Sequence, residues 1–275
     1  MARYEQCSIN ELTLQGDIRR VDPRRSTITI EGNELTQAWY EQSAAQLYPL
    51  GTRLLHNDGR VFRYASASGA LVAGNLLQSA ANGGTTTLQK DLVVATSSAV
   101  GAYTGYATIS VDTIAANLFT DGYYIVSVGT AAQGRGQIYQ IKSHPVSAAA
   151  SIAFTFYEPV RVAITAGAAQ VALTTNLYKA VIQAPITTPT GVIVGVAPIA
   201  VTTAYYFWTQ TWGIANVLVQ TATTAGTAVM RDVAAAGSVG VQAAGATSLA
   251  TEVVGYAPSV TDTTDNGFVF LTIAP

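Results

Sequence analysis

The feature that most constrains the fold is a long stretch without charge. From residue 180 to residue 230, between Lys179 and Arg231, the chain contains no Asp, Glu, Lys or Arg. Three prolines interrupt this stretch, so it does not resemble a transmembrane helix, which needs about 20 mainly apolar residues. Its β-branched residues alternate with Thr, Gln and Gly between recurrent turn residues, which is typical of β-strands. We therefore predict a mainly β fold without a membrane span.

The shortage of charge extends over the whole chain. Charged residues make up 11% of the sequence and the formal net charge is −2, whereas an average globular chain is roughly 25% charged. Charge keeps soluble proteins apart, so a surface this poor in charge predicts a protein that works inside an assembly. We expect a homo-oligomer, with a trimer as the favoured state. The small net charge also predicts no nucleic-acid partner and no association with an anionic membrane.

Two further features bear on where the chain is made. Residues 1–11 contain no apolar core of the kind that a secretory signal needs. Cys7 is the only cysteine, so no disulfide forms within the chain. Both features predict synthesis in a reducing cytoplasm.

Charge is distributed unevenly along the chain. The first 90 residues contain nine Lys or Arg and eight Asp or Glu, whereas the remaining 185 contain five and eight. This contrast predicts an N-terminal arm over residues 1–35, a helix–hairpin subdomain with a linker over residues 36–90, and a charge-poor β body over residues 91–275. A division of the body into two β subdomains, 91–200 and 201–275, is the alternative.

Local patterns place two elements and a linker in the second region. Glu34–Leu47 has few turn residues and places three apolar side chains on one face, which predicts a short helix. Residues 52–55 and 60–64 are predicted to pair as a hairpin, because Asp58-Gly59 between them supplies the positive φ angles that a tight turn requires. Residues 66–90 are rich in small residues and are predicted to form a linker or extended arm.

The body shows short runs of β-forming residues separated by Gly, Pro or Asn-Gly. Such spacing favours an antiparallel sandwich or barrel over an alternation of strands and helices. Residues 233–250 are rich in Ala and Gly and favour small strands and loops over a helix. The predicted strands, including one in the N-terminal arm, are 26–31, 91–95, 106–111, 123–128, 137–142, 152–157, 160–164, 178–183, 191–196, 204–210, 215–220, 227–231, 252–256 and 267–273.

No set of residues has the spacing of a catalytic or metal site. His56 and His144 lack clustered ligands at short spacing, so both are predicted to be surface turn residues. Cys7 has no neighbouring basic residue placed to activate it. The carboxylates lie mainly beside turn residues, although a pair brought together by folding stays open. We therefore predict no catalytic residue, no cofactor and no metal, and a non-enzymatic protein.

Two groups of residues are candidates for contacts with other chains. A basic cluster is predicted to act as an arm that pairs with acidic residues of a neighbour; a solvated strand and turn is the alternative. In the aromatic run Tyr205–Trp212 one of two alternating sets must face the core, which predicts core packing plus a subunit contact rather than a platform for sugars. The candidate contact residues are Arg19, Arg20, Arg24, Arg25, Tyr206, Trp208 and Trp212.

Several segments resemble parts of the structural proteins of tailed bacteriophage heads. Tyr48–Ala65 resembles an N-terminal hairpin found in many of them. The C-terminal β domain of such proteins has an aromatic strand, then hairpins rich in Gly, Ala and Val, then a closing apolar strand. The segments similar to it are Tyr205–Gly213, Ala228–Val241, Val253–Ala257 and Gly267–Ile273, whereas residues 66–200 have no counterpart.

This resemblance implies the family of capsid decoration, or cement, proteins. These are β-rich, non-enzymatic proteins bound to the outer shell in symmetric clusters. The resemblance thus implies a location on the virion, with the major capsid protein and further copies of the chain as partners. We expect a structural protein that binds the outer surface of a phage capsid and stabilises its lattice. The alternative is a receptor- or glycan-binding module of the tail-fibre or tailspike type, in which the aromatic cluster would be exposed.

Overall fold

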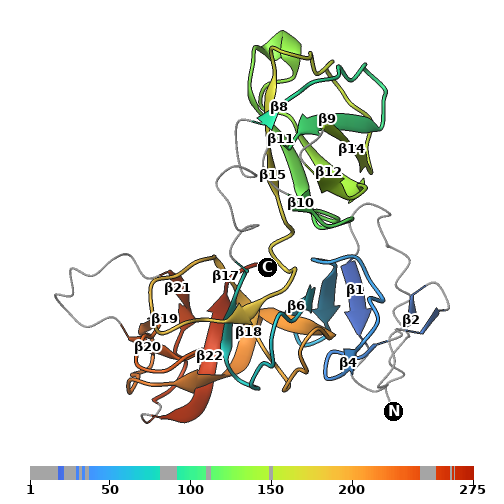
Figure 1. Cartoon of the computed structure of the whole chain (residues 1–275). Coiled ribbons are helices and arrows are strands. Elements are labelled where there is room, and N and C mark those ends of the chain that lie inside the picture. Colours follow the sequence, from blue (N-terminus) through green and yellow to red (C-terminus); the bar gives the residue numbers. More distant parts are fainter. Residues whose placement is uncertain are drawn as a thin grey trace, which may run out of the picture.

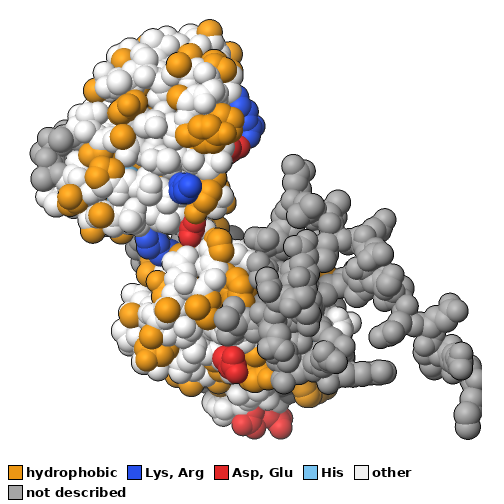
Figure 2. All heavy atoms as spheres, turned by 90° about the vertical axis from the view of Figure 1, so that its right-hand side faces the viewer, with side chains coloured by type: hydrophobic (Ala, Val, Ile, Leu, Met, Phe, Trp, Pro, Cys, Tyr) orange, Lys and Arg blue, Asp and Glu red, His pale blue; other side chains and the backbone are white. Residues whose placement is uncertain are grey.

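The computed structural model describes residues 18–21, 29–30, 33–34, 37–80, 92–109, 113–148, 151–241, 252–260, 262 and 264–275, with the N-terminal pieces before residue 37 described by their backbone alone. The structure is mainly β, and its two large sheets form closed or nearly closed barrel-like bodies (Figure 1). The prediction of a mainly β, barrel- or sandwich-type fold is confirmed. On the face seen in Figure 2, charged side chains are few.

The larger body is built on a twelve-stranded sheet. Its path runs β1-β5-β6-β18-β20-β19-β21-β22, with β4, β7, β16 and β17 joined to it beside this path. Most neighbours are antiparallel, whereas β1 pairs with β5 and β18 with β20 in parallel. The strands are β1 (Ile18–Val21), β4 (Gln42–Ser43), β5 (Arg53–His56), β6 (Val61–Ser66), β7 (Leu76–Gln78), β16 (Ile182–Gln183), β17 (Ile193–Val196), β18 (Tyr206–Val219), β19 (Ala228–Arg231), β20 (Val239–Val241), β21 (Val253–Tyr256) and β22 (Asp265–Thr272).

The smaller body is built on a six-stranded antiparallel sheet in the order β8-β15-β11-β12-β14-β9. Two short ribbons, β2 with β3 and β10 with β13, and one turn of 3-10 helix complete the described elements. The strands and this turn are β2 (Thr29–Ile30), β3 (Asn33–Glu34), β8 (Leu92–Val93), β9 (Thr104–Thr108), β10 (Thr113–Ile114), β11 (Tyr123–Val128), β12 (Ile138–Ser143), β13 (Ser147–Ala148), β14 (Ser151–Phe156), β15 (Gln170–Thr174) and η1 (Ala131–Gln133).

The predicted hairpin is confirmed by the antiparallel pairing of β5 with β6. The turn differs from the expected one, because only Gly59 has a positive φ, 88°, and its N–H donates to His56 O at 2.9 Å. Of the predicted N-terminal arm, residues 18–21 lie in the twelve-stranded sheet beside β5. The predicted strand 26–31 lies largely outside the described residues.

The predicted helix over Glu34–Leu47 is wrong. Residues 37–47 form turns and the short strand β4 instead. The side-chain amide of buried Gln37 donates to Glu41 O and to Tyr206 O, both at 2.9 Å, and Trp39 stacks on Phe62. These tertiary contacts outweigh a local helical preference, which is a weak force in a segment of this length.

Other expectations for strands also need correction. Residues 66–90 are not a linker throughout, because β7 lies within them and Leu76 and Leu77 are completely buried. Residues 160–164 form a loop joined to the six-stranded body by the bridge between Ser98 and Ile164. The two strands predicted at 204–210 and 215–220 are one continuous strand, β18.

The aromatic run is buried on both sides of β18. Trp208 packs with Leu54, Phe62 and Tyr64 in one cluster, while Phe207 packs against a second cluster that includes Leu77 and Val194. The expectation that one alternating set faces the core therefore describes only half of the packing. A strand covered on both faces loses the simple alternation of apolar and polar residues.

The two sheets do not divide the chain at residue 200, which was the alternative boundary considered between two β subdomains. Strands β16 and β17 pair with β7 and β18 in the larger body, so the smaller body ends with β15. Sheet membership alone does not show which part folds independently, and the domain limits stay a prediction.

Candidate functional site: an exposed apolar face

The outer face of β18, β21 and β22 presents large apolar side chains to solvent. Tyr256, Phe270 and Ile214 lie in one row, because each is paired with the next across neighbouring strands. Their exposed fractions are 49%, 36% and 45%, and Phe268, one pleat along β22, is 60% exposed. We call these four residues and Trp212 the apolar face.

Strand β22 shows how the sequence produces this face. Side chains alternate across a sheet, so Val269 and Leu271 point into the core, where both are completely buried. Phe268 and Phe270 therefore point outward. An antiparallel strand with one solvent face normally places polar residues there. The outward phenylalanines depart from this pattern and leave an exposed apolar surface, a feature that is often found at binding sites.

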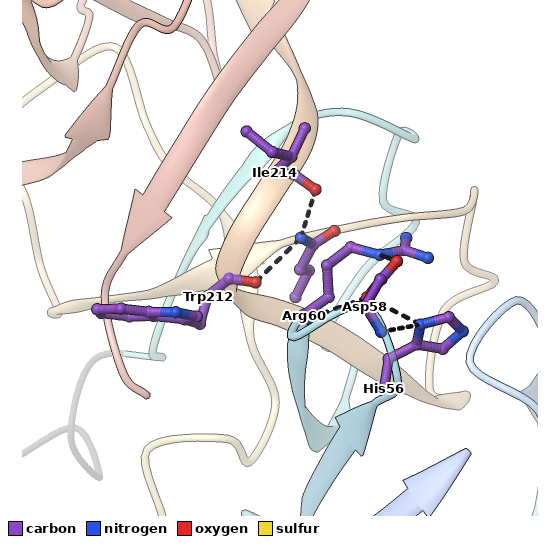
Figure 3. Close-up of polar contacts among 6 residues, drawn as sticks. His56, Asp58, Arg60, Trp212 and Ile214 are labelled. Atoms are coloured by element: carbon purple, nitrogen blue, oxygen red, sulfur yellow. Dashed lines mark hydrogen bonds and ion pairs between the residues drawn. The ribbon is translucent and has the colours of Figure 1, made fainter. Parts of the chain in front are cut away.

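Trp212 is held at the edge of the face by a local irregularity in β18. The register between β18 and β6 shifts between Gln210 and Trp212, and Gly213 has a φ of 85°. The Gln210 side-chain amide donates to Trp212 O at 3.2 Å and to Ile214 O at 2.9 Å, and so bridges the irregularity (Figure 3). A Cβ at Gly213 would lie 3.1 Å from Arg60 Cγ, so only glycine suits this position without adjustment. The Trp212 and Phe270 rings meet edge to face at 5.7 Å.

The turn of the β5–β6 hairpin adds a charged rim beside Trp212. Asp58 Oδ2 accepts a hydrogen bond from Arg60 Nε at 2.7 Å, and His56 Nδ1 lies 2.8 Å from Asp58 Oδ1 (Figure 3). Partial burial raises the pKa of Asp58, but hydrogen bonds from Arg60 and His56 outweigh burial and leave this pKa below its usual value. Asp58 is therefore ionised at neutral pH and paired with Arg60.

A shallow pocket of about 500 Å³ lies between this rim and the apolar face. Its lining includes Asp58, Arg60, Trp212, Ile214 and Phe270. The pocket combines flat aromatic surface with one ion pair, so its chemistry is that of binding by apolar contact with a polar edge. In the part of the chain that the structure describes, no three His, Cys, Asp or Glu side chains gather as a metal site would require. Over the same residues, no helix has the length and apolar character to cross a membrane.

The structure places the predicted contact residues in four different settings. Trp212 lies on the apolar face, and half-buried Tyr206 stacks on Tyr64 at 6.1 Å. Trp208 has no exposed surface and its Nε1 donates to Gln37 O at 3.1 Å, so it cannot contact another chain in this fold. Arg19 and Arg20 lie in β1, paired with residues 54 and 55. Arg24 and Arg25 lie outside the described residues.

Sequence reasoning missed most of the apolar face. Phe268, Phe270, Ile214 and Tyr256 were not among the predicted contact residues. The run Phe268–Leu271 is apolar at every position, so alternation gives no sign of which side chains face outward. The sequence offered no signal that separates them, because the pairing of this run with β18 is known only from the structure.

The prediction that both histidines are surface turn residues is wrong. His56 and His144 are 9% and 4% exposed. His144 Nε2 accepts a hydrogen bond from Phe119 N at 3.0 Å, and Nδ1 lies 2.8 Å from Pro145 O. Burial, with the nearby positive charge of Lys179, lowers the pKa of His144. This residue is therefore a neutral part of the smaller body's core.

Comparisons with known proteins identify no relative of this chain. No protein-family model, no curated protein and no solved structure gives a significant match.

Proposed function

We propose that this protein is a non-enzymatic structural protein of a phage virion, which binds the outer surface of the capsid and stabilises its lattice. The observation that supports the proposal best is the apolar face, where Tyr256, Phe270 and Ile214 form an exposed row across three strands. A face of this kind is unfavourable in water and becomes favourable when a partner covers it. The major capsid protein and further copies of this chain are the proposed partners.

The apolar face is small, which suits a protein that binds at many identical sites at once. Covering one large apolar side chain contributes about 1.5–3 kcal/mol, and ordering two molecules cancels much of that gain. A single contact through four or five such residues is therefore modest. On a lattice with many identical positions, linked copies reinforce one another and hold firmly without a tight individual site.

A glycan-binding module of the tail-fibre or tailspike type is the second candidate. It is supported by the pocket beside Trp212, where an aromatic ring lies next to the Asp58–Arg60 ion pair. Flat aromatic surfaces with adjacent polar groups are also suited to sugars. This candidate uses only the rim of the apolar face and leaves Phe268 and Tyr256 without a role.

The test compares variants of the face with a matched variant elsewhere. Phe268→Thr with Phe270→Thr keeps β-forming residues while it removes the aromatic rings. Tyr103→Thr, at an exposed position of the smaller body, is the control. Light scattering at tens of micromolar should show an oligomer for the unmodified chain and for the control, and a shift toward monomer for the double variant.

Imaging of the particle that carries this chain supplies the second part of the test. Cryo-electron microscopy should show the protein on the outer shell, with the apolar face against the capsid protein or a neighbouring copy. A stable monomer in solution together with absence from the shell would overturn the proposal. Saturable binding to a neutral glycan array, lost on Trp212→Ala, would favour the second candidate.

A further inference from the structure

Two arginines stand opposite each other on the β5–β6 hairpin. Arg53 and Arg63 are direct partners in the antiparallel ladder, and the neighbouring pair Leu54 and Phe62 is buried in the core. Since side chains alternate along each strand, the two guanidinium groups leave the hairpin on the same side, away from that core. Like charges in directly opposite positions destabilise a sheet unless another group compensates them.

Within the described residues, no Asp or Glu side chain forms an ion pair with Arg53 or Arg63. The ion pairs found there involve Asp58 and Glu158, and neither reaches Arg53 or Arg63. Arg63 Nη1 donates to Gly51 O at 3.1 Å and Nη2 to Pro275 O at 3.4 Å. The Nε atoms of both arginines are buried and have no hydrogen-bond partner. Buried donors in native proteins are nearly always paired, so these two Nε groups are unusual among the described side chains.

The arginines line a pocket of about 570 Å³ at the junction of the two bodies. Tyr123, Gln140 and Tyr157 approach from the smaller body. A volume of this size lies within the usual range for small-molecule sites, roughly 300–1,000 Å³. The pocket thus offers cationic donors on one wall and aromatic and amide groups on the other.

One carboxylate, that of Asp121, also borders the pocket, but its oxygens are already engaged. Oδ2 accepts hydrogen bonds from Leu50 N and Gln46 Nε2, both at 3.3 Å. Oδ1 accepts from Tyr157 OH at 3.2 Å. Asp121 thus ties the two bodies together and does not pair with the arginines, so the described lining keeps two positive charges against one negative charge.

We propose that this pocket binds an oxyanion, a carboxylate or phosphate group of a small ligand, through Arg53 and Arg63. Guanidinium groups present parallel N–H donors that match both kinds of oxyanion. The bound group would accept hydrogen bonds from the guanidinium groups that line the pocket and offset the repulsion across the hairpin. The tyrosine rings would contact the body of the ligand. This site is independent of the apolar face and does not rest on the proposed function.

Calorimetric titration at low salt tests the site with three probes: inorganic phosphate, glucuronate, and glucose as the neutral counterpart of glucuronate. Phosphate, glucuronate or both should bind saturably, and glucose should not. Arg53→Gln and Arg63→Gln, made singly, should each weaken binding at least tenfold. Arg161→Gln, which removes an exposed guanidinium from the smaller body, is the control and should bind as the unmodified chain does.

The outcomes distinguish a phosphate ligand from a carboxylate ligand, and they also show when the proposal is wrong. Binding of phosphate alone assigns the site to phosphate groups, and binding of glucuronate alone assigns it to carboxylates. Should Arg63→Gln fail to fold, Arg53→Gln decides the test, because the buried Arg53 Nε has no hydrogen-bond partner that the substitution would remove. Three results would each overturn the proposal. The first is no saturable binding of either anion up to 10 mM, a concentration that corresponds to a binding free energy of about −2.7 kcal/mol. The others are binding of glucose equal to that of the anions, and unchanged affinity in Arg53→Gln.

Discussion

The two bodies of the molecule are assembled in opposite ways. The six-stranded sheet takes all its strands from residues 92–174, so its partners are close in sequence. The twelve-stranded sheet combines strands from both sides of that segment, and Phe62 pairs with Gln210 across the whole smaller body. The smaller body therefore resembles an insertion into the larger one, and the path of the chain makes the larger body depend on long-range pairing.

The difference extends to how each body is packed. Among the described residues, the smaller body has one apolar cluster inside its curved sheet. The larger body has three there, which lie on both sides of β18 and include Trp208 and Phe207. Loss of a core side chain should thus have local effects in the smaller body and wide effects in the larger one. The following experiments test this comparison in order of decreasing effect.

Removal of one large core side chain from each body should have the largest effect. Trp208→Ala and Phe154→Ala should each lower the free energy of unfolding by about 3–5 kcal/mol, because both side chains are completely buried. Hydrogen exchange read by mass spectrometry should show faster exchange of β9–β15 peptides in Phe154→Ala. In Trp208→Ala the peptides from β5, β6 and β18 should exchange faster. Equal acceleration in both bodies for Phe154→Ala would show that they unfold as one unit.

The junction between the bodies supplies the next test. The Asn176 side-chain amide donates to Leu50 O at 3.1 Å and to Asp121 O at 2.8 Å, and all of these groups are buried. Asn176→Ala leaves two carbonyl groups without this donor and should cost about 1–3 kcal/mol in urea unfolding. Asn216→Ala, at an exposed position of β18, is the matched control and should change stability by less than about 0.5 kcal/mol. Equal costs for the two variants would mean that Asn176 does not join the bodies energetically.

Acid should weaken the smaller body through His144. Its pKa is lowered in the folded state by burial. As pH falls below the unfolded-state pKa of about 6.5, the unfolded chain takes up a proton before the folded one, so stability decreases until pH passes the lower folded-state pKa. Thermal unfolding between pH 7 and pH 5 should show this loss. In His144→Gln, which keeps a donor and an acceptor, the dependence over that range should flatten. A slope that persists unchanged in the variant would assign it to other groups.

An exposed ion pair of the smaller body should contribute least. Arg161 and Glu158 form an ion pair in which the arginine side chain is 68% exposed. Arg161→Gln should change the free energy of unfolding by no more than about 0.5 kcal/mol, because water and salt screen such pairs. The Arg161 backbone N–H keeps its hydrogen bond to Tyr139 OH in the variant. A cost above 1 kcal/mol (about twice the expected ceiling) would show that the pair orders the 160–164 loop.

The sequence predicted individual strands in both bodies, but it missed β15 of the smaller one. Residues 123–128 were predicted as a strand and match β11 because their pairing partners are nearby and the alternation is regular. Glu34–Leu47 was assigned a helix because the contacts that fix it, from Gln37 to Tyr206, lie far away in the chain. The two strands predicted at 204–210 and 215–220 left residues 211–214 as a gap, whereas β18 runs through them and Gln210 bridges the irregularity there.

The candidate site was predictable only in part, for a related reason. Trp212 was identified from its aromatic neighbours, but Trp208 in the same run is buried, and no local pattern separates the two. Phe270 and Tyr256 become visible as a surface only when β21 and β22 are placed beside β18. An apolar run is compatible with a core or with an interface, and the register between strands decides which of the two it becomes.

The long strand β18 has a consequence for how the chain emerges from the ribosome. Strand β6 is paired along the edge it shares with β18 only when residues 206–212 of β18 have been made. The 139 residues between β6 and β18 take on the order of ten seconds to synthesise at roughly 5–20 residues per second. The six-stranded sheet, which ends at Thr174, can close earlier in that interval. The nascent chain therefore carries a finished smaller body while the strands β4 and β6, which pair with β18, still have an open edge.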